Sequence, residues 1–189
     1  MKDNLAAALT RRRVLAAGGL TLSGVALGSN ALAQTDDSDG ESETDDESET
    51  RHYRVTVANN TRGQPFTPPA VAAHQDSVEV FSVGDRANEA TQQLAENGNL
   101  GPLLDLIANT DAIRDAAVGD SPLVPQEDPA DTGNPYHTTL TLSADASARY
   151  LTFVSMLVAT NDGIVGLDTV PLPENVNESR TYYANGYDV

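Results

Sequence analysis

Residues 150–168 constrain the fold most, because their pattern predicts two buried strands joined by a turn. The run Tyr150–Val158 is apolar and β-branched, the chain breaks at Asn161-Asp162-Gly163, and Ile164-Val165 resumes the apolar pattern. Asn, Asp and Gly tolerate the positive φ angles that tight hairpin turns require. We therefore predict a hairpin with Asp162 at the end of a sheet, where carboxylate and carbonyl oxygens suit a hard cation. A purely turn-forming role is the alternative for Asp162.

Other segments show the two-residue alternation of strands that bury one face. In 52–57 the alternating residues are Tyr53, Val55 and Val57, and 137–143 has the same pattern. Further strands are predicted at 77–83, 165–170 and 181–183.

Two helices are predicted between these strands. Arg86–Glu96 ends before Asn97-Gly98, a favourable helix stop. Gly101–Ala117 has Leu and Ile at near-helical spacing, with a break at Asn109-Thr110, and 120–135 is predicted to be a loop. Short strands with one helical insertion predict a mainly β fold, an antiparallel β-sandwich.

The charge of the chain excludes two classes of partner. The formal net charge is −17, and beyond residue 33 there is no Lys, with seven Arg against 27 acidic residues. Such a surface repels nucleic acid and anionic membranes, so we expect neither as a partner. Dense carboxylate suits a salt-rich solvent and predicts a halophile's protein, with an acidic low-salt protein as the alternative. Without Cys, disulfides and thiolate metal sites are excluded.

Residues 1–33 have the pattern of an export signal. Paired arginines in Thr10–Leu15 are followed by a mildly apolar stretch, Ala16–Leu27, and by the small-residue cleavage site Ala31-Leu32-Ala33. The arginines are similar to a twin-arginine signal, which predicts a secreted or cell-surface protein. The apolar stretch is short for a membrane span, so we expect cleavage and no transmembrane span afterwards; an uncleaved anchor is the alternative.

Residues 34–50 form a second, low-complexity segment rich in Asp, Glu, Ser and Thr. The segment offers no apolar side chain to bury, so we predict a disordered acidic linker. It would act as a tether or as a solvated tail without a partner. Residues 51–189 then form the predicted domain.

Few residues carry a pattern of catalysis. His52, His74 and His137 lack zinc-site spacing, so each is expected to be structural or at the surface. Gly119-Asp120-Ser121 is followed by no base that could activate the serine.

Two sequons, at Asn59 and Asn177, are candidates for glycosylation on an exported protein. Unused sequons are the alternative for both positions.

Four segments resemble the spondin domain in order and spacing. They are Tyr53–Thr61 with Gln64–Pro68 behind it, Phe81–Gly98, Ser155–Gly166 around Asn161-Asp162-Gly163, and Tyr187–Val189. The resemblance covers about Tyr53 to Val189. It implies an extracellular β-sandwich, related in architecture to C2 domains, with calcium at one end of the sheets.

The resemblance implies Asp162 and Asp188 as calcium ligands. A further acid that the family has four residues after Asp188 is missing, and the family's closing strand would lie beyond Val189. We therefore expect a truncated chain with an incomplete calcium site. Asn161-Asp162-Gly163 also stands where the family has Pro-Asp-Trp, so the turn should pack more loosely.

These observations predict an exported, non-enzymatic, calcium-stabilised adhesion or matrix-type binding domain. Its ligand would be an extracellular or cell-surface glycan or protein. One alternative is a secreted hydrolase that uses two carboxylates on surface polysaccharide. The chain has no Trp and few Phe and Tyr for sugar stacking, which disfavours it. A purely structural cell-envelope protein is the other alternative.

Overall fold

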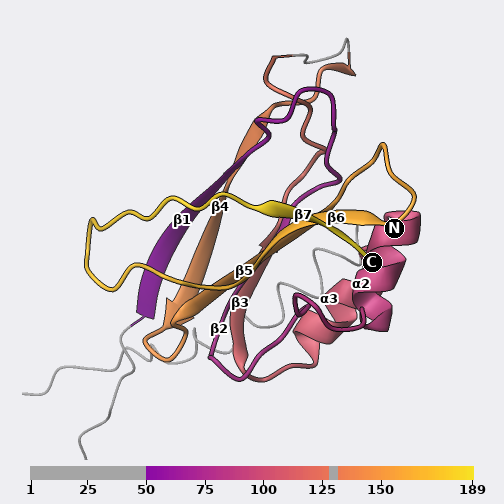
Figure 1. Cartoon of the computed structure of the whole chain (residues 1–189). Coiled ribbons are helices and arrows are strands. Elements are labelled where there is room, and N and C mark those ends of the chain that lie inside the picture. Colours follow the sequence, from indigo (N-terminus) through magenta and orange to yellow (C-terminus); the bar gives the residue numbers. More distant parts are fainter. Residues whose placement is uncertain (1–49, 128–131) are drawn as a thin grey trace, which may run out of the picture.

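The computed structural model describes residues 50–127 and 132–189. The export signal and all but the last residue of the acidic linker lie outside these residues. The described part holds seven strands in two antiparallel sheets and two short helices, which confirms the mainly β prediction (Figure 1). No helix in the described ranges is long and apolar enough to cross a membrane.

The smaller sheet pairs β1 (Thr50–Ala58) with β4 (His137–Asp145). The larger sheet has the order β3-β2-β5-β6-β7. Its strands are β3 (Ile113–Val118), β2 (Ala70–His74), β5 (Tyr150–Met156), β6 (Gly163–Pro171) and β7 (Asn185–Asp188).

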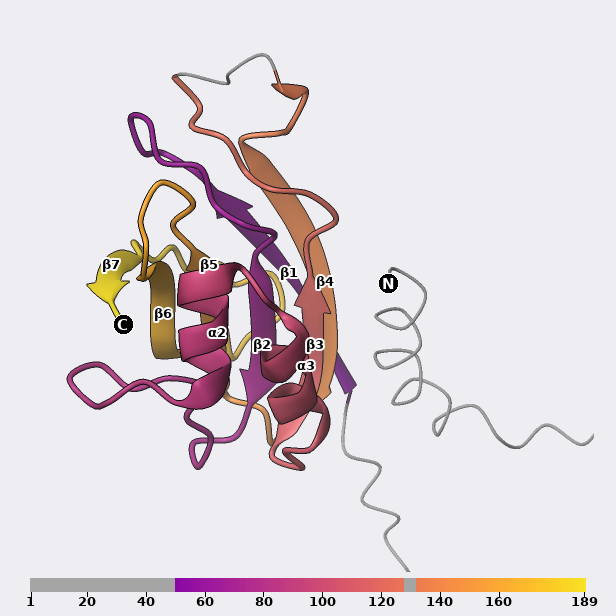
Figure 2. The same ribbon diagram turned by 90° about the vertical axis from the view of Figure 1, so that its right-hand side faces the viewer.

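The two faces of the larger sheet are covered differently. On one face, Phe153 and Val165 share an apolar core with Val57 and Leu142 of the smaller sheet. On the other face, the helices α2 (Glu89–Asn97) and α3 (Gly101–Ala108) cover the sheet (Figure 2). The smaller sheet and the helices therefore lie on opposite sides of the five strands.

Strand β1 follows its predicted pattern. Arg51, Tyr53, Val55 and Val57 are shielded on one face, while the residues between them are exposed. The strand is paired along its whole length with β4, from Thr50 opposite Asp145 to Ala58 opposite His137. The 137–143 strand is confirmed as well.

The first helix is also confirmed, with a later start than predicted. Asn88 caps α2 by accepting a hydrogen bond from Thr91 N, and Gly98 ends it in the left-handed conformation at φ 61°. A side chain at Gly98 would be strained there, which is why Asn-Gly is an effective stop.

Three predicted elements are wrong. The helix over 101–117 ends at Ala108, and its second half is strand β3. Residues 77–83 form an irregular segment instead of a strand, with Val78 and Val80 buried against the helices. The final strand begins at Asn185, after the predicted 181–183.

The β5–β6 hairpin exists, but its turn differs from the prediction. Residues 157–162 connect the strands, and Leu157 N donates to Gly163 O at 2.8 Å. Positive φ angles among the described residues lie elsewhere, so Asn161-Asp162-Gly163 does not need them. Instead, Thr160 Oγ1 accepts from Gly163 N and donates to Leu157 O, which shapes the longer loop.

Candidate functional site

The structure brings the two predicted metal ligands to the same end of the larger sheet. Gly163, directly after Asp162, pairs with Asp188 across β6 and β7. Val189 N also donates to Asp162 O at 3.1 Å. Asp162 is half-buried and Asp188 is exposed. Two residues that are 26 positions apart in the chain therefore lie at the same end of the larger sheet.

These carboxylates fit a calcium site in chemistry and position, but not in number. Calcium takes six to eight oxygen ligands in proteins. Within 50–127 and 132–189, no three His, Asp or Glu side chains are grouped closely enough to hold a metal ion. The carbonyl of Asp162 already accepts a hydrogen bond from Val189. At this end of the sheet the described residues therefore offer the carboxylates of Asp162 and Asp188 without a third such side chain grouped with them.

A groove of about 850 Å³ opens between the two sheets on the face away from the helices. One wall is six consecutive residues of β1, Tyr53–Ala58, and the other is Glu178–Ala184, which leads into β7. The floor is apolar and comes from β5 and β6. Its main side chains are Leu151, Phe153, Val165 and Leu167.

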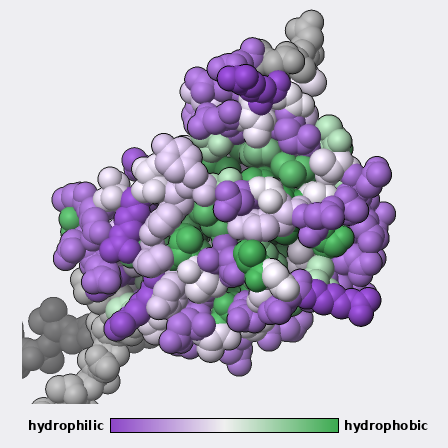
Figure 3. Space-filling view, viewed as in Figure 1, coloured by the Kyte–Doolittle hydropathy of each residue, from purple (hydrophilic) through white to green (hydrophobic). Residues whose placement is uncertain are grey.

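The rim of the groove is polar. Figure 3 shows hydrophobic atoms gathered in the hollow part of this face, with hydrophilic side chains around them. Arg54, Arg180 and Tyr182 contribute to the lining, and Tyr183 beside them is 87% exposed. An apolar floor with a few polar groups around it is the composition typical of ligand-binding grooves.

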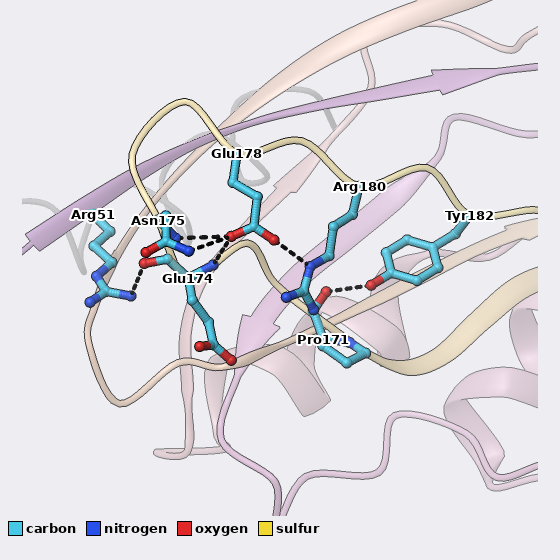
Figure 4. A network of polar contacts seen from close by, with 7 residues as sticks. All are labelled: Arg51, Pro171, Glu174, Asn175, Glu178, Arg180 and Tyr182. Carbon is cyan, nitrogen blue, oxygen red and sulfur yellow. Dashed lines mark hydrogen bonds and ion pairs between the residues drawn. The ribbon is translucent and has the colours of Figure 1, made fainter.

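The second wall is held by a network of side chains centred on Glu178 (Figure 4). Its carboxylate accepts hydrogen bonds from the backbone N of Glu174, from Asn175 and from Arg180 Nε. The hydrogen bond from Arg180, with those from Asn175, lowers the pKa of Glu178 to about 2. The charged form that these bonds need is therefore present across the ordinary pH range.

Two further bonds tie this wall to the rest of the domain. Arg51 on β1 donates to Glu174 O at 3.4 Å, and Tyr182 Oη donates to Pro171 O at 2.7 Å (Figure 4). The loop is thereby joined both to the start of β1 and to the end of β6. These bonds fix the position of the loop that forms the second wall.

The structure places the first glycosylation candidate, Asn59, in the interior, where its amide is engaged. Its side chain is fully buried, and Nδ2 donates to both Gln64 O and Leu123 O. Its Oδ1 accepts from Thr61 N and Thr61 Oγ1. An amide nitrogen with both hydrogens bonded inside the protein has no room for a glycan. Asn59 instead fixes the 59–64 loop, a role that Asn and Thr two residues apart often take.

The second candidate, Asn177, is exposed and has φ 65° in the loop between β6 and β7. Its use as a glycosylation site stays a prediction.

The histidines lie apart from the groove. His74 is fully buried, with Nδ1 bonded to Gln75 O and Nε2 to Thr152 Oγ1. Burial lowers the pKa of His74, so the neutral ring is favoured. His52 is exposed and contacts Ser143 Oγ at 2.8 Å, and His137 is also exposed. A structural role for His74 agrees with the prediction.

Sequence reasoning missed the groove. The alternation of Tyr53, Val55 and Val57 marks one wall, but 178–184 has no apolar periodicity. The pairing of distant segments across a groove leaves no local pattern.

No protein-family model matches the chain, and a search of the curated proteins finds no match to it either. The resemblance to the spondin domain stays a prediction.

Proposed function

We propose that this chain is an exported, non-enzymatic binding domain of adhesion or matrix type, and that it holds its ligand in the groove between the two sheets. The observation that carries the proposal is the groove itself, with an apolar floor and a polar rim. The twin-arginine pattern and cleavage site in residues 1–33 support export. Membranes and nucleic acid are poor ligands for so acidic a chain.

The rim residues support binding. Tyr182 and Tyr183 offer rigid, amphipathic surface beside an apolar floor. Tyr and Arg are enriched among residues that carry binding energy in protein interfaces. Arg54 and Arg180 add positive charge and hydrogen-bond donors to the groove, in a domain where basic residues are scarce.

We further propose that calcium binds weakly beside Asp162 and Asp188. The support is their common position at one end of β6 and β7. The remaining oxygens would come from backbone carbonyls and water, which fits the weak class of extracellular sites, about 10⁻⁴–10⁻³ M. Binding would stabilise the fold by mass action.

The groove is tested with a variant that fills it. Ala184→Trp places an indole in the wall of the groove, and Val83→Trp adds the same side chain to an exposed loop outside the groove lining. The full chain and both variants are applied to a glycan array and to a peptide array. We expect the full chain to bind one class of glycan or peptide. Ala184→Trp should abolish that binding, and Val83→Trp should retain it.

Two results would contradict the proposal. One is binding that both variants retain equally, which would locate the ligand away from the groove. The other is turnover of a chromogenic glycoside or ester by the full chain, because a binding domain has no reacting groups to supply.

A further inference from the structure

The groove follows the edge of β1 and not its face. Successive side chains of a strand point to opposite sides, so a groove on one face would be lined by alternate residues. Here Tyr53–Ala58 line it without a gap. The groove must therefore run along the edge of the strand, where the backbone itself is presented.

This edge of β1 is unpaired. β1 lies at the end of its sheet, and β4 is its sole strand partner in the described residues. Along 51–58 no backbone hydrogen bond is made to any described residue outside that ladder. A row of free N–H and C=O groups is a template for pairing with a further strand.

The side chains around the edge of β1 determine which residue types an added strand needs. Tyr53, Val55 and Val57 lie on the shielded face, next to the apolar floor. A strand added beside them would place apolar residues at every second position over Phe153 and Val165. Six residues in extended form span about 20 Å, the length of the Tyr53–Ala58 wall.

The outer face adds a charge preference. Arg54 is exposed on β1, and no ion pair or hydrogen bond joins its side chain to a described residue. A residue directly opposite on an added strand would lie about 5 Å away, close enough for an acidic side chain to pair with it.

Two occupants from the chain itself fit less well. A second copy carries the same large negative charge and would set a second Arg54 near the first if two β1 edges paired. Residues 34–49 supply acids for Arg54, but they have no apolar side chain for the floor. An extended peptide from another protein satisfies the edge, the floor and the charge together.

We propose that the groove binds an extended peptide of a partner protein as a strand added to β1, with apolar residues inward and an acidic residue opposite Arg54. This rests on the proposed binding function and names its ligand class. The backbone of β1 supplies the affinity, and the floor and Arg54 supply the sequence preference.

The probe is a fluorescein-labelled, capped heptapeptide of alternating Thr and Val, with Glu in place of one inner Thr. A second peptide has Lys at that position, and a third has alternate backbone nitrogens methylated. Fluorescence anisotropy measures their binding to the full chain, at the lowest salt at which circular dichroism shows it folded, because salt screens exposed charges.

We expect the Glu peptide to bind roughly three- to tenfold more tightly than the Lys peptide. Arg54→Glu should reverse that order, and Arg86→Glu, an exposed arginine in the loop before α2, should leave it unchanged. The methylated peptide should not bind. Hydrogen exchange of the 53–58 amides should slow on adding the Glu peptide.

Several results would overturn the inference. They are no peptide binding up to millimolar concentration, binding that survives methylation, and equal effects of Arg54→Glu and Arg86→Glu. Binding that appears only after residues 34–49 are deleted would assign the edge to that segment. A dimer that protects the 53–58 amides without peptide would assign it to a second copy. Groove-dependent glycan binding without peptide binding would also overturn it, while leaving the proposed binding function standing.

Discussion

The substitution Asn59→Asp tests the loop that borders the groove. The change is nearly isosteric, so it creates no cavity. The new carboxylate can still accept from Thr61, but it cannot donate to Gln64 O or Leu123 O as Nδ2 does at 2.8 and 3.1 Å. Leu123 O keeps Phe66 N as a donor, and the one hydroxyl hydrogen of Thr61 can go to Gln64 O while Thr61 N still donates to the carboxylate. The damage is therefore confined to two hydrogen bonds and one buried charge.

The cost follows from these terms. Two lost hydrogen bonds account for about 1–3 kcal/mol. A buried carboxylate facing two carbonyl oxygens adds to this, so we expect a loss of about 2–4 kcal/mol at neutral pH. In a domain of this size that lowers the melting temperature by roughly 5–15 °C. Burial raises the folded-state pKa of the introduced carboxyl, so the penalty shrinks as pH falls and the group becomes protonated.

The assay is thermal or urea unfolding followed by circular dichroism at neutral and acidic pH. Asn60→Asp is the matched control, since Asn60 is exposed and the change should alter stability by no more than about 0.5 kcal/mol. Equal destabilisation by the two variants would refute the reasoning. So would a penalty for Asn59→Asp that does not depend on pH.

Two further predictions concern titration and metal binding. Because the folded-state pKa of His74 lies below its ordinary 6.5, the unfolded chain takes up the proton first, and stability should fall as pH drops below about 6.5. In the variant His74→Gln, the free energy of unfolding should depend less on pH in this range. A pH dependence that His74→Gln leaves unchanged and His52→Gln removes would contradict the assignment to His74. Calcium at tenfold excess over its Kd should add about 1.4 kcal/mol to stability, and chelator or Asp162→Asn should remove the gain. Asp120→Asn is the control for surface charge, and a calcium effect that it abolishes equally would count against the site.

Two of the correctly predicted strands, β1 and β4, have one face toward solvent and one toward the core. β1 and β4 belong to a two-stranded sheet, so polar residues alternate with Tyr53, Val55 and Leu142. Their period of two is visible in the sequence because solvent lies on one side.

The central strands lack that signal. β2 is buried on both faces, with Ala70 and Ala72 toward the helices and Val71 and Ala73 toward the smaller sheet. Its sequence neither alternates nor favours a strand by composition, since Ala has low β-propensity. β3 was predicted as helix because Ile113, Ala116 and Ala117 follow near-helical spacing. For β2, burial between the helices and the smaller sheet, and not local preference, makes these residues a strand.

The candidate site was predictable in part. Asp162 and Asp188 were named as candidate ligands from the sequence, and the pairing of β6 with β7 brings their positions together; their role as ligands stays a prediction. The groove could not be predicted, because its walls lie at least 120 residues apart in the chain, and the segments that carry them are joined by contacts such as Arg51 to Glu174. The buried role of Asn59 depends equally on Leu123, a partner that no local pattern reveals.

The pairing of β1 with β4 has a consequence for the order of folding. The strand partner of β1 is β4, which begins at His137. Both edges of β1 therefore stay unpaired until most of the chain has been synthesised. Contacts of such long sequence separation form slowly, and an open strand edge promotes aggregation meanwhile. The nine acidic residues of 34–49 lie directly before β1 and would act as gatekeepers, because their mutual repulsion keeps nascent chains apart.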